Sequence, residues 1–137
     1  MDDPSSVNYP ILDSVKTICC DEYFNALEIT HIEDQETKDK VRDMLAQSHM
    51  KVCYGAQPRL LNPNDLDEEG RKKAEAVLMD SIDEARYMGA KGIAFLAGKW
   101  EPETKEQAYA QLLKTTRAVC SYAATKGMMV ELEVFDF

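Results

Sequence analysis

Residues 84–98 read EARYMGAKGIAFLAG, and they join the end of a helix, a glycine and a strand in direct succession. The helix that ends in this stretch begins further upstream, and its apolar residues recur at steps of three and four, which indicates one buried face of an α-helix. They are Ala74, Val77, Leu78, Ile82, Ala85 and Met88. Gly89 suits the left-handed position that follows a helix, and the short apolar run after it is typical of a strand. The stretch therefore predicts one α/β unit.

The same change of hydrophobic period recurs along the whole chain. Helices are expected over residues 9–22, over 35–48, from Asp65 or Asp67 to Gly89, and from the loop GKWEPETKE to Gly127. The inward face of the last helix is expected to carry Ala108, Leu112, Thr116, Val119 and Ala123. Strands are expected over residues 25–30, 50–55, 92–98 and 128–135. Each crossover is long enough for a helix, so the strands should be parallel. The chain is thus predicted to be one α/β domain, 1–137, with about four parallel β/α units.

Charge, hydropathy and cysteine pattern limit the possible partners. The formal charge is −9, and the chain has no basic stripe of the kind that neutralises nucleic-acid phosphates. No apolar run approaches the ~20 residues needed to span a bilayer. We therefore expect neither a nucleic-acid nor a membrane partner. Cys19, Cys20, Cys53 and Cys120 form no Cys-x-x-Cys pair and follow no secretory signal, which favours reduced thiols in a cytoplasmic protein.

Three stretches together carry a resemblance to a known family. They are FNALEITHIE at residues 24–33, EARYMGAKGIAFLAG at 84–98 and ATKGMMVELEVFD at 124–136. In this order and spacing the chain resembles the xylose isomerase-like barrels, which include sugar phosphate isomerases, ketose 3-epimerases and family 2 apurinic endonucleases. The resemblance implies a partial (β/α)₈ TIM barrel that runs from the first barrel helix to the fifth strand. A complete barrel usually needs roughly 250 residues, so we expect the N- and C-terminal parts of the barrel to be missing.

Glu133 is the residue to which the resemblance gives a catalytic and metal-binding role. In the family, a Glu at the carboxyl end of strand five binds a divalent metal, and VELEVFD supplies Glu133 there. Side chains alternate along a strand, so Glu131 and Glu133 should share the barrel face while Val130 and Leu132 pack on helices. A carboxylate suits Mn²⁺ or Mg²⁺. Glu131 lies about 7 Å deeper, and a carboxylate there needs a partner.

Further candidates follow the ends of the expected strands. Glu28 and His31 accompany the first strand, Tyr54 ends the second, and Trp100 follows the third. At the rim of a barrel they would line a sugar pocket, with Trp100 offering its apolar ring. Two alternatives stay open, because His31 is equally consistent with an ordinary loop histidine and Tyr54 with a packed core residue.

The resemblance implies a metal-assisted sugar isomerase or epimerase that moves a proton on a ketose through an enediolate. The expected ligand is a small sugar or sugar phosphate, with Mn²⁺ or Mg²⁺ as cofactor. Glu133 alone does not complete a metal site, so the remainder of the barrel or a second copy is an expected partner, and the fragment alone is expected to be inactive. Alternatives are a small non-enzymatic α/β binding module, or another lyase or hydrolase on the same barrel.

Overall fold

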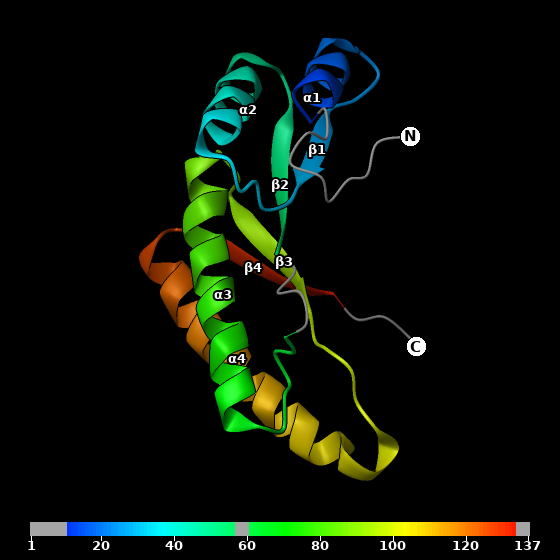
Figure 1. Ribbon diagram of the computed structural model, residues 1–137, viewed down its shortest axis with the longest axis vertical. Helices are drawn as coiled ribbons and strands as arrows, with labels where there is room; N and C mark the ends of the chain where they lie inside the picture. The colour runs from blue at the N-terminus through cyan, green and yellow to red at the C-terminus, as the bar shows by residue number, and fades with distance from the viewer. Residues whose placement is uncertain (1–10, 57–60, 134–137) are drawn as a thin grey trace.

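The computed structural model describes residues 11–56 and 61–133, where four strands alternate with helices (Figure 1). The helices are α1 (Ile11–Cys20), α2 (Gln35–Gln47), α3 (Glu68–Tyr87), the short 3₁₀ helix η1 (Pro102–Thr104) and α4 (Lys105–Thr125). The strands are β1 (Ala26–Ile29), β2 (Lys51–Ala56), β3 (Gly92–Leu96) and β4 (Met129–Glu133). Residues 9–10 and 134–135, which the predicted first helix and last strand include, lie outside the described residues. Within them, no helix combines the length and apolar character that crossing a membrane requires.

All four strands are parallel and lie in the order β1-β2-β3-β4. The strands are staggered, because β1 pairs with Lys51–Tyr54 of β2, whereas β3, among the residues that the structure describes, pairs with Gly55 and Ala56. Such a stagger is what closing a sheet into a barrel requires. The arrangement confirms the predicted α/β architecture of parallel units and is consistent with part of a TIM barrel.

Two helices end as their glycines predict. Gly89 has φ +91°, its N–H donates to Arg86 O at 3.1 Å, and the N–H of Ala90 donates to Ala85 O at 2.9 Å. This pair of bonds is the Schellman motif, which satisfies the last carbonyl groups of α3. Gly127, with φ +67°, repeats the motif after α4. At the start of α3, Asp67 is the N-cap, since its side chain accepts from the N–H of Gly70.

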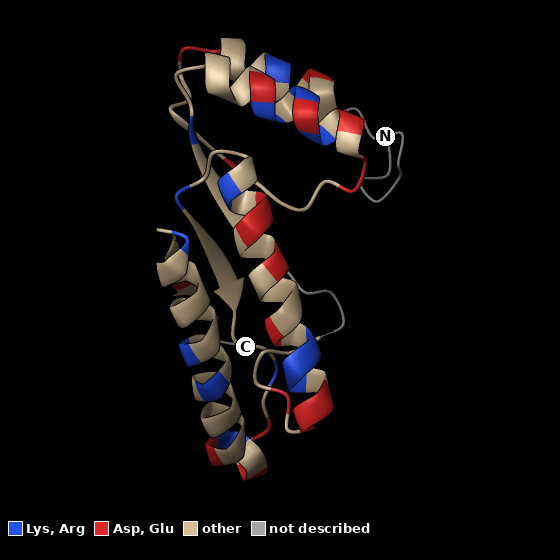
Figure 2. Ribbon diagram, turned by 90° about the vertical axis from the view of Figure 1, so that its left-hand side faces the viewer, with Lys and Arg blue, Asp and Glu red and all other residues tan. Residues whose placement is uncertain are grey.

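The helices cover one face of the sheet, and the core lies between the two layers (Figure 1). Helix α3 packs on β2 and β3, α4 packs on β4 and α3, and α1 packs on α2. Figure 2 shows acidic and basic residues interspersed along α2, on the outer layer. The largest fully buried core side chains are Phe95, Leu78, Ile82, Met88, Val41 and Val119. The opposite face of the sheet is uncovered by the described residues, and Met129 on it is 70% exposed.

Ala108, Val119 and Ala123 of α4 are buried as predicted, but in the middle of the helix the buried positions lie one residue earlier than predicted. Thr115 is fully buried, whereas Thr116 and Leu112 are half-buried, and Gln111 is buried as well. The reason is that two polar side chains of α4 form hydrogen bonds with the loop before α3, which a hydrophobic pattern does not predict. The Thr115 hydroxyl donates to Pro63 O at 2.6 Å, and Gln111 Nε2 donates to Asp65 O at 2.9 Å.

Arg71 ties this contact to α3. Its guanidinium donates to Glu68 and Glu75 at 2.7 Å each, and to Thr115 Oγ1 at 3.2 Å. The bonds from Arg71 and then Gln111 lower the pKa of Glu68 to about 2. Side chains of α3 and α4 are therefore hydrogen-bonded to one another and to the loop before α3. The buried guanidinium of Arg71 is paired with carboxylates in this network.

Candidate functional site

The uncovered face of the sheet carries the side chains of Glu28, Glu131 and Glu133. Because parallel partners point their side chains to the same side, the register places Glu28 with Cys53, Ala94 with Glu131 and Leu96 with Glu133. Ile29, Tyr54 and Phe95, on the alternate positions, are buried against the helices. Glu131 and Glu133 thus lie on the face that would be a barrel interior, and Glu133 is at the carboxyl edge of β4.

Glu28 lies across this face toward β2. A Cβ built on Gly55 would come within 2.5 Å of Glu28 Oε1 and 3.7 Å of Thr30 Cγ2. The missing side chain of Gly55 therefore makes room for the carboxylate of Glu28. Two acidic residues from opposite edges of the sheet, Glu28 and Glu133, thus share one face with Glu131.

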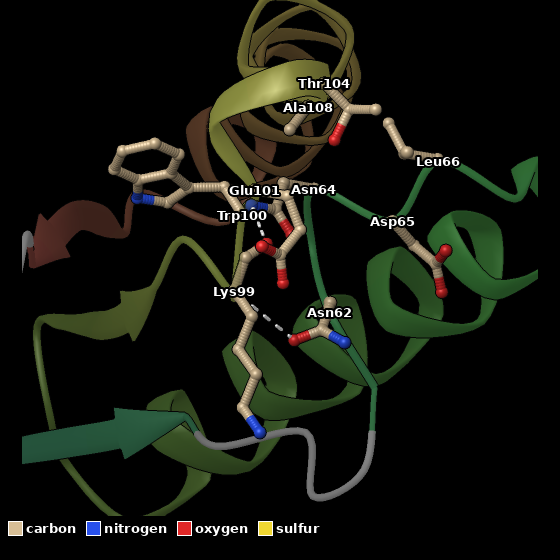
Figure 3. Close-up of a pocket in the computed structure, with 9 residues that line it drawn as sticks. All are labelled: Asn62, Asn64, Asp65, Leu66, Lys99, Trp100, Glu101, Thr104 and Ala108. Atoms are coloured by element: carbon tan, nitrogen blue, oxygen red, sulfur yellow. Dashed lines mark hydrogen bonds between the residues drawn. The ribbon is translucent and has the colours of Figure 1, made fainter. Parts of the chain in front are cut away.

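A pocket of about 220 Å³ opens beyond the carboxyl ends of β2 and β3 (Figure 3). It is lined by the loop before α3 and by the segment from β3 to the start of α4: Asn62, Asn64, Asp65, Leu66, Lys99, Trp100, Glu101, Thr104 and Ala108. Trp100 is 47% exposed, and Lys105 Nζ stands 5.1 Å from the centroid of its ring. An aromatic face among amide and carboxylate groups suits a polyhydroxylated ligand.

Two asparagines that the sequence analysis missed hold the wall of this pocket. Asn64 Nδ2 donates to Lys99 O at 2.8 Å, and the Lys99 N–H donates to Asn62 Oδ1 at 3.4 Å (Figure 3). Between the pocket loops, Gly98 has φ +109°, and a Cβ on it would run into Asn64 Oδ1 and lie 3.0 Å from Asn62 Cβ. The only signal in the sequence is the pair of asparagines around Pro63 and the glycine before Lys99.

Gly98→Ala is expected to destabilise the protein by about 2–3 kcal/mol, because it adds backbone strain and a clash at once. The matched control is Gly89→Ala, where φ is +91° but nothing lies within 4 Å of the added Cβ. The free energy of unfolding of that control should fall by only about 1 kcal/mol, because the substitution adds backbone strain without a clash. Urea unfolding followed by circular dichroism measures both. Equal losses for the two variants would mean that the contact of Gly98 with the asparagines is unimportant.

His31 and Tyr54 turn away from the carboxylate face. Both contact Glu84 on α3: His31 Nδ1 lies 2.9 Å from Glu84 Oε2, and the Tyr54 hydroxyl donates to the same oxygen. Lys38 Nζ of α2 pairs with Glu84 Oε1 at 2.6 Å. Tyr54 is 2% exposed and belongs to the core. Its packing against the helices separates it from Glu28, Glu131 and Glu133, so we do not include Tyr54 in the site.

The cluster around Glu84 is a charge network that is largely buried except at His31. Burial raises the pKa of Glu84, but the hydrogen bonds from Lys38, Tyr54 and His31 outweigh it, so the pKa lies below its ordinary value. Burial and then the bond to Glu84 raise the pKa of Tyr54 well above its ordinary value. The network therefore holds Glu84 ionised and Tyr54 neutral, and it joins the loop after β1 to α2, β2 and α3.

Acid is expected to weaken the fold. A carboxyl whose pKa is lowered by folding stabilises the protein above its unfolded pKa and loses that contribution as the pH falls through the folded value. For Glu68 and Glu84 the unfolded value is near 4.5, and the folded pKa of Glu68 is about 2. The thermal midpoint should therefore fall between about pH 4.5 and pH 2. Glu84→Gln should flatten that fall. An identical pH dependence in parent and variant would exclude Glu84 as a source of the acid sensitivity.

A divalent metal, which the resemblance implies, does not find a complete site in the residues described. Within 11–56 and 61–133, no three His, Cys, Asp or Glu side chains come together to hold an ion. Glu133 would offer a hard oxygen ligand on the uncovered face of the sheet. The other ligands would have to come from outside the described residues.

The comparisons with known proteins agree on fold and family. Residues 21–137 match the model of a family described as the xylose isomerase-like TIM barrel. A D-tagatose 3-epimerase-like protein is 16% identical with a TM-score of 0.72, over 80% of this chain and 43% of that one. No curated protein sequence matches.

Two further solved structures are similar. D-Psicose 3-epimerase from Clostridium cellulolyticum H10, solved with D-tagatose, has a TM-score of 0.73 at 18% identity, over 92% of this chain and 46% of that one. A xylose isomerase-like TIM barrel protein from Mycobacterium smegmatis, in complex with magnesium, has a TM-score of 0.58 at 17% identity, over 91% and 45%. The chain therefore spans less than half the length of these similar structures.

Proposed function

Because the chain belongs to the xylose isomerase-like TIM barrel family, we propose that it forms part of a sugar isomerase or epimerase. The reaction is proton transfer at the carbon next to a ketose carbonyl, on a small sugar or sugar phosphate. One observation carries the proposal: Glu133, the family's carboxylate position, lies on the uncovered face of the sheet at the carboxyl edge of β4. Active sites of such barrels form at that edge.

The role of Glu133 follows from its chemistry and place. As a carboxylate beside a bound ketose, it would accept the proton of the carbon next to the carbonyl, which leaves an enediolate. Return of that proton to the former carbonyl carbon would give the isomer, whereas a proton delivered by a second group to the opposite face of the same carbon would give the epimer. The same carboxylate would be one ligand of a bound Mn²⁺ or Mg²⁺. The metal would polarise the carbonyl and stabilise the negative charge on its oxygen.

The ligand would lie between the carboxylate face and the rim pocket. Trp100 would pack its exposed ring on the apolar face of the sugar, while Glu28 would accept hydrogen bonds from hydroxyl groups. His31 contacts Glu84 through its Nδ1 and turns away from this face, so it is not included in this arrangement. These assignments rest on position and residue type.

Completion of the site would need more than these residues. The remaining ligands and catalytic groups would come from the remainder of a barrel or from a second copy of the chain, since the described residues bring together no metal site. Intact mass together with light scattering on the natural gene product distinguishes the possibilities. A chain near twice this length, or a tight dimer, supports the proposal, and a stable 137-residue monomer contradicts it.

The compartment proposed is the cytoplasm. All four cysteines are free thiols, with Cys20, Cys53 and Cys120 exposed. Exposed thiols persist in a reducing environment.

The function is tested by incubating the natural gene product with a panel of ketoses and ketose phosphates, with Mn²⁺, with Mg²⁺ and with a chelator. Chromatography should reveal an isomer or epimer of one substrate that forms only when metal is present. A metal-loaded protein that converts none of the panel, yet binds one of the sugars without change, would contradict the proposal and favour a binding module.

A further inference from the structure

We propose that Asn62 and Asn64 are positioning residues, which clamp the backbone of Lys99 and thereby fix Trp100 at the wall of the rim pocket. The clamp itself is independent of the reaction. Only its consequence for sugar binding rests on the proposed function, through the assignment of Trp100 as the surface on which a sugar packs.

The clamp lies beyond the described end of the β2–β3 ladder. Strand β3 ends at Leu96, and among the described residues its pairing with β2 runs to Phe95 opposite Ala56. Lys99 lies beyond this ladder, yet both of its backbone groups are bonded, its carbonyl to Asn64 Nδ2 and its N–H to Asn62 Oδ1. Two side chains at positions i and i+2 thus provide the donor and acceptor that a neighbouring strand would provide. Trp100 is the next residue in the chain, so the hydrogen bonds of Lys99 restrain the backbone position of Trp100.

The base of the clamp is anchored by α4. Asn64 is only 5% exposed, and the residues on both sides of it are held: Pro63 O accepts from Thr115, and Asp65 O accepts from Gln111. Thr115 in turn accepts a hydrogen bond from Arg71. The same helix α4 begins with Lys105, whose amine stands over the Trp100 ring. The backbone before Trp100 is therefore held by the asparagines, and Lys105 of α4 stands over its ring.

The two asparagines form opposite kinds of hydrogen bond with Lys99, so the same substitution at each position should have different effects. Asn64 acts as a donor, and its Oδ1 is buried and accepts no hydrogen bond from the described part of the chain. Asn62 acts toward Lys99 as an acceptor only. A carboxylate accepts but does not donate. Asn62→Asp therefore keeps its half of the clamp, whereas Asn64→Asp loses its half and sets an anion against the Lys99 carbonyl.

Trp100 is the only tryptophan of the 137 residues, so its fluorescence reports on the loop directly. We expect Asn64→Asp to raise the acrylamide quenching constant of the 137-residue protein about twofold or more, because loss of one hydrogen bond shifts a local opening equilibrium several-fold. Asn62→Asp should leave the constant near that of the parent. Circular dichroism on each variant checks that it is folded.

Either of two results would overturn the clamp: a folded Asn64→Asp protein with the quenching of the parent, or equal increases for both aspartates. If Asn64→Asp does not fold, Asn64→Ala decides in its place, since it removes the donor without adding a charge. Ketose titrations of the natural gene product separate the two proposals. Weaker ketose binding in Asn64→Ala with little change in kcat supports both. An increase in quenching in a protein for which no ketose binds or reacts upholds the clamp and rejects the function.

Discussion

Glu133→Gln is expected to reduce ketose turnover by the natural gene product about a thousandfold or more, and to weaken Mn²⁺ binding with it. Glutamine has the same shape as glutamate but neither the negative charge nor the basicity of a carboxylate. General acid–base catalysis alone contributes about 10²–10⁴-fold, and loss of a charged oxygen ligand weakens a hard cation further. Steady-state kinetics, with Mn²⁺ titrated by electron paramagnetic resonance, measures both effects.

Glu131→Gln is the matched control for this prediction. Glu131 has the same side chain on the same face of β4, one inward position deeper, and it pairs in register with Ala94 rather than with the last residue of β3. We expect its loss to change turnover much less, because its carboxylate lies below the carboxyl edge of the sheet. Equal effects of the two substitutions, or normal turnover in Glu133→Gln, would remove Glu133 from the proposed mechanism.

Glu84→Ala is expected to lower the free energy of unfolding by about 3 kcal/mol, the usual result of breaking a buried ion pair from one side. The Glu84 side chain is 9% exposed and serves Lys38, His31 and Tyr54 together. Its removal leaves the ammonium of Lys38 unpaired and the hydroxyl of buried Tyr54 without its acceptor, and each orphaned group has a cost. This is a large share of the ~5–15 kcal/mol that typically stabilises a domain.

The control for Glu84 is an ion pair of the same residue types on the surface. Lys40 Nζ pairs with Glu36 Oε1 at 2.9 Å, but both side chains are largely exposed. Glu36→Ala should therefore lower the free energy of unfolding by no more than about 0.5 kcal/mol. Denaturant unfolding of both variants gives the comparison. A Glu84→Ala protein as stable as Glu36→Ala would show that the cluster contributes little to stability.

The fold could be predicted because its signals are local. Gly89 ends α3 as its sequence position indicates, and the alternation in VELE places Glu133 on one face and Leu132 on the other. Such signals need only the neighbours along the chain. The family resemblance follows from the same local features in the right order.

Tyr54 shows where local reasoning stops. The expected strand over residues 50–55 left both a rim position and a packed core position open for Tyr54, and the structure places it in the core, facing the helices. Adjacent positions of a strand point to opposite faces, and which face is buried depends on what packs against it. The role of Glu84 and the clamp on Lys99 were missed for another reason. Tyr54 and Glu84 are 30 residues apart, and Asn64 and Lys99 are 35 apart, so only the packed fold brings them together.

The most direct test of the central claim, proton transfer at the carbon next to a ketose carbonyl, is deuterium incorporation from heavy water. The natural gene product is incubated with Mn²⁺ and each ketose of the panel, and the recovered sugar is analysed by NMR. We expect deuterium to enter at that carbon of one substrate, and chelator or Glu133→Gln to abolish the exchange. A sugar that is transformed without any solvent deuterium, or exchange that persists in Glu133→Gln, would contradict the central claim.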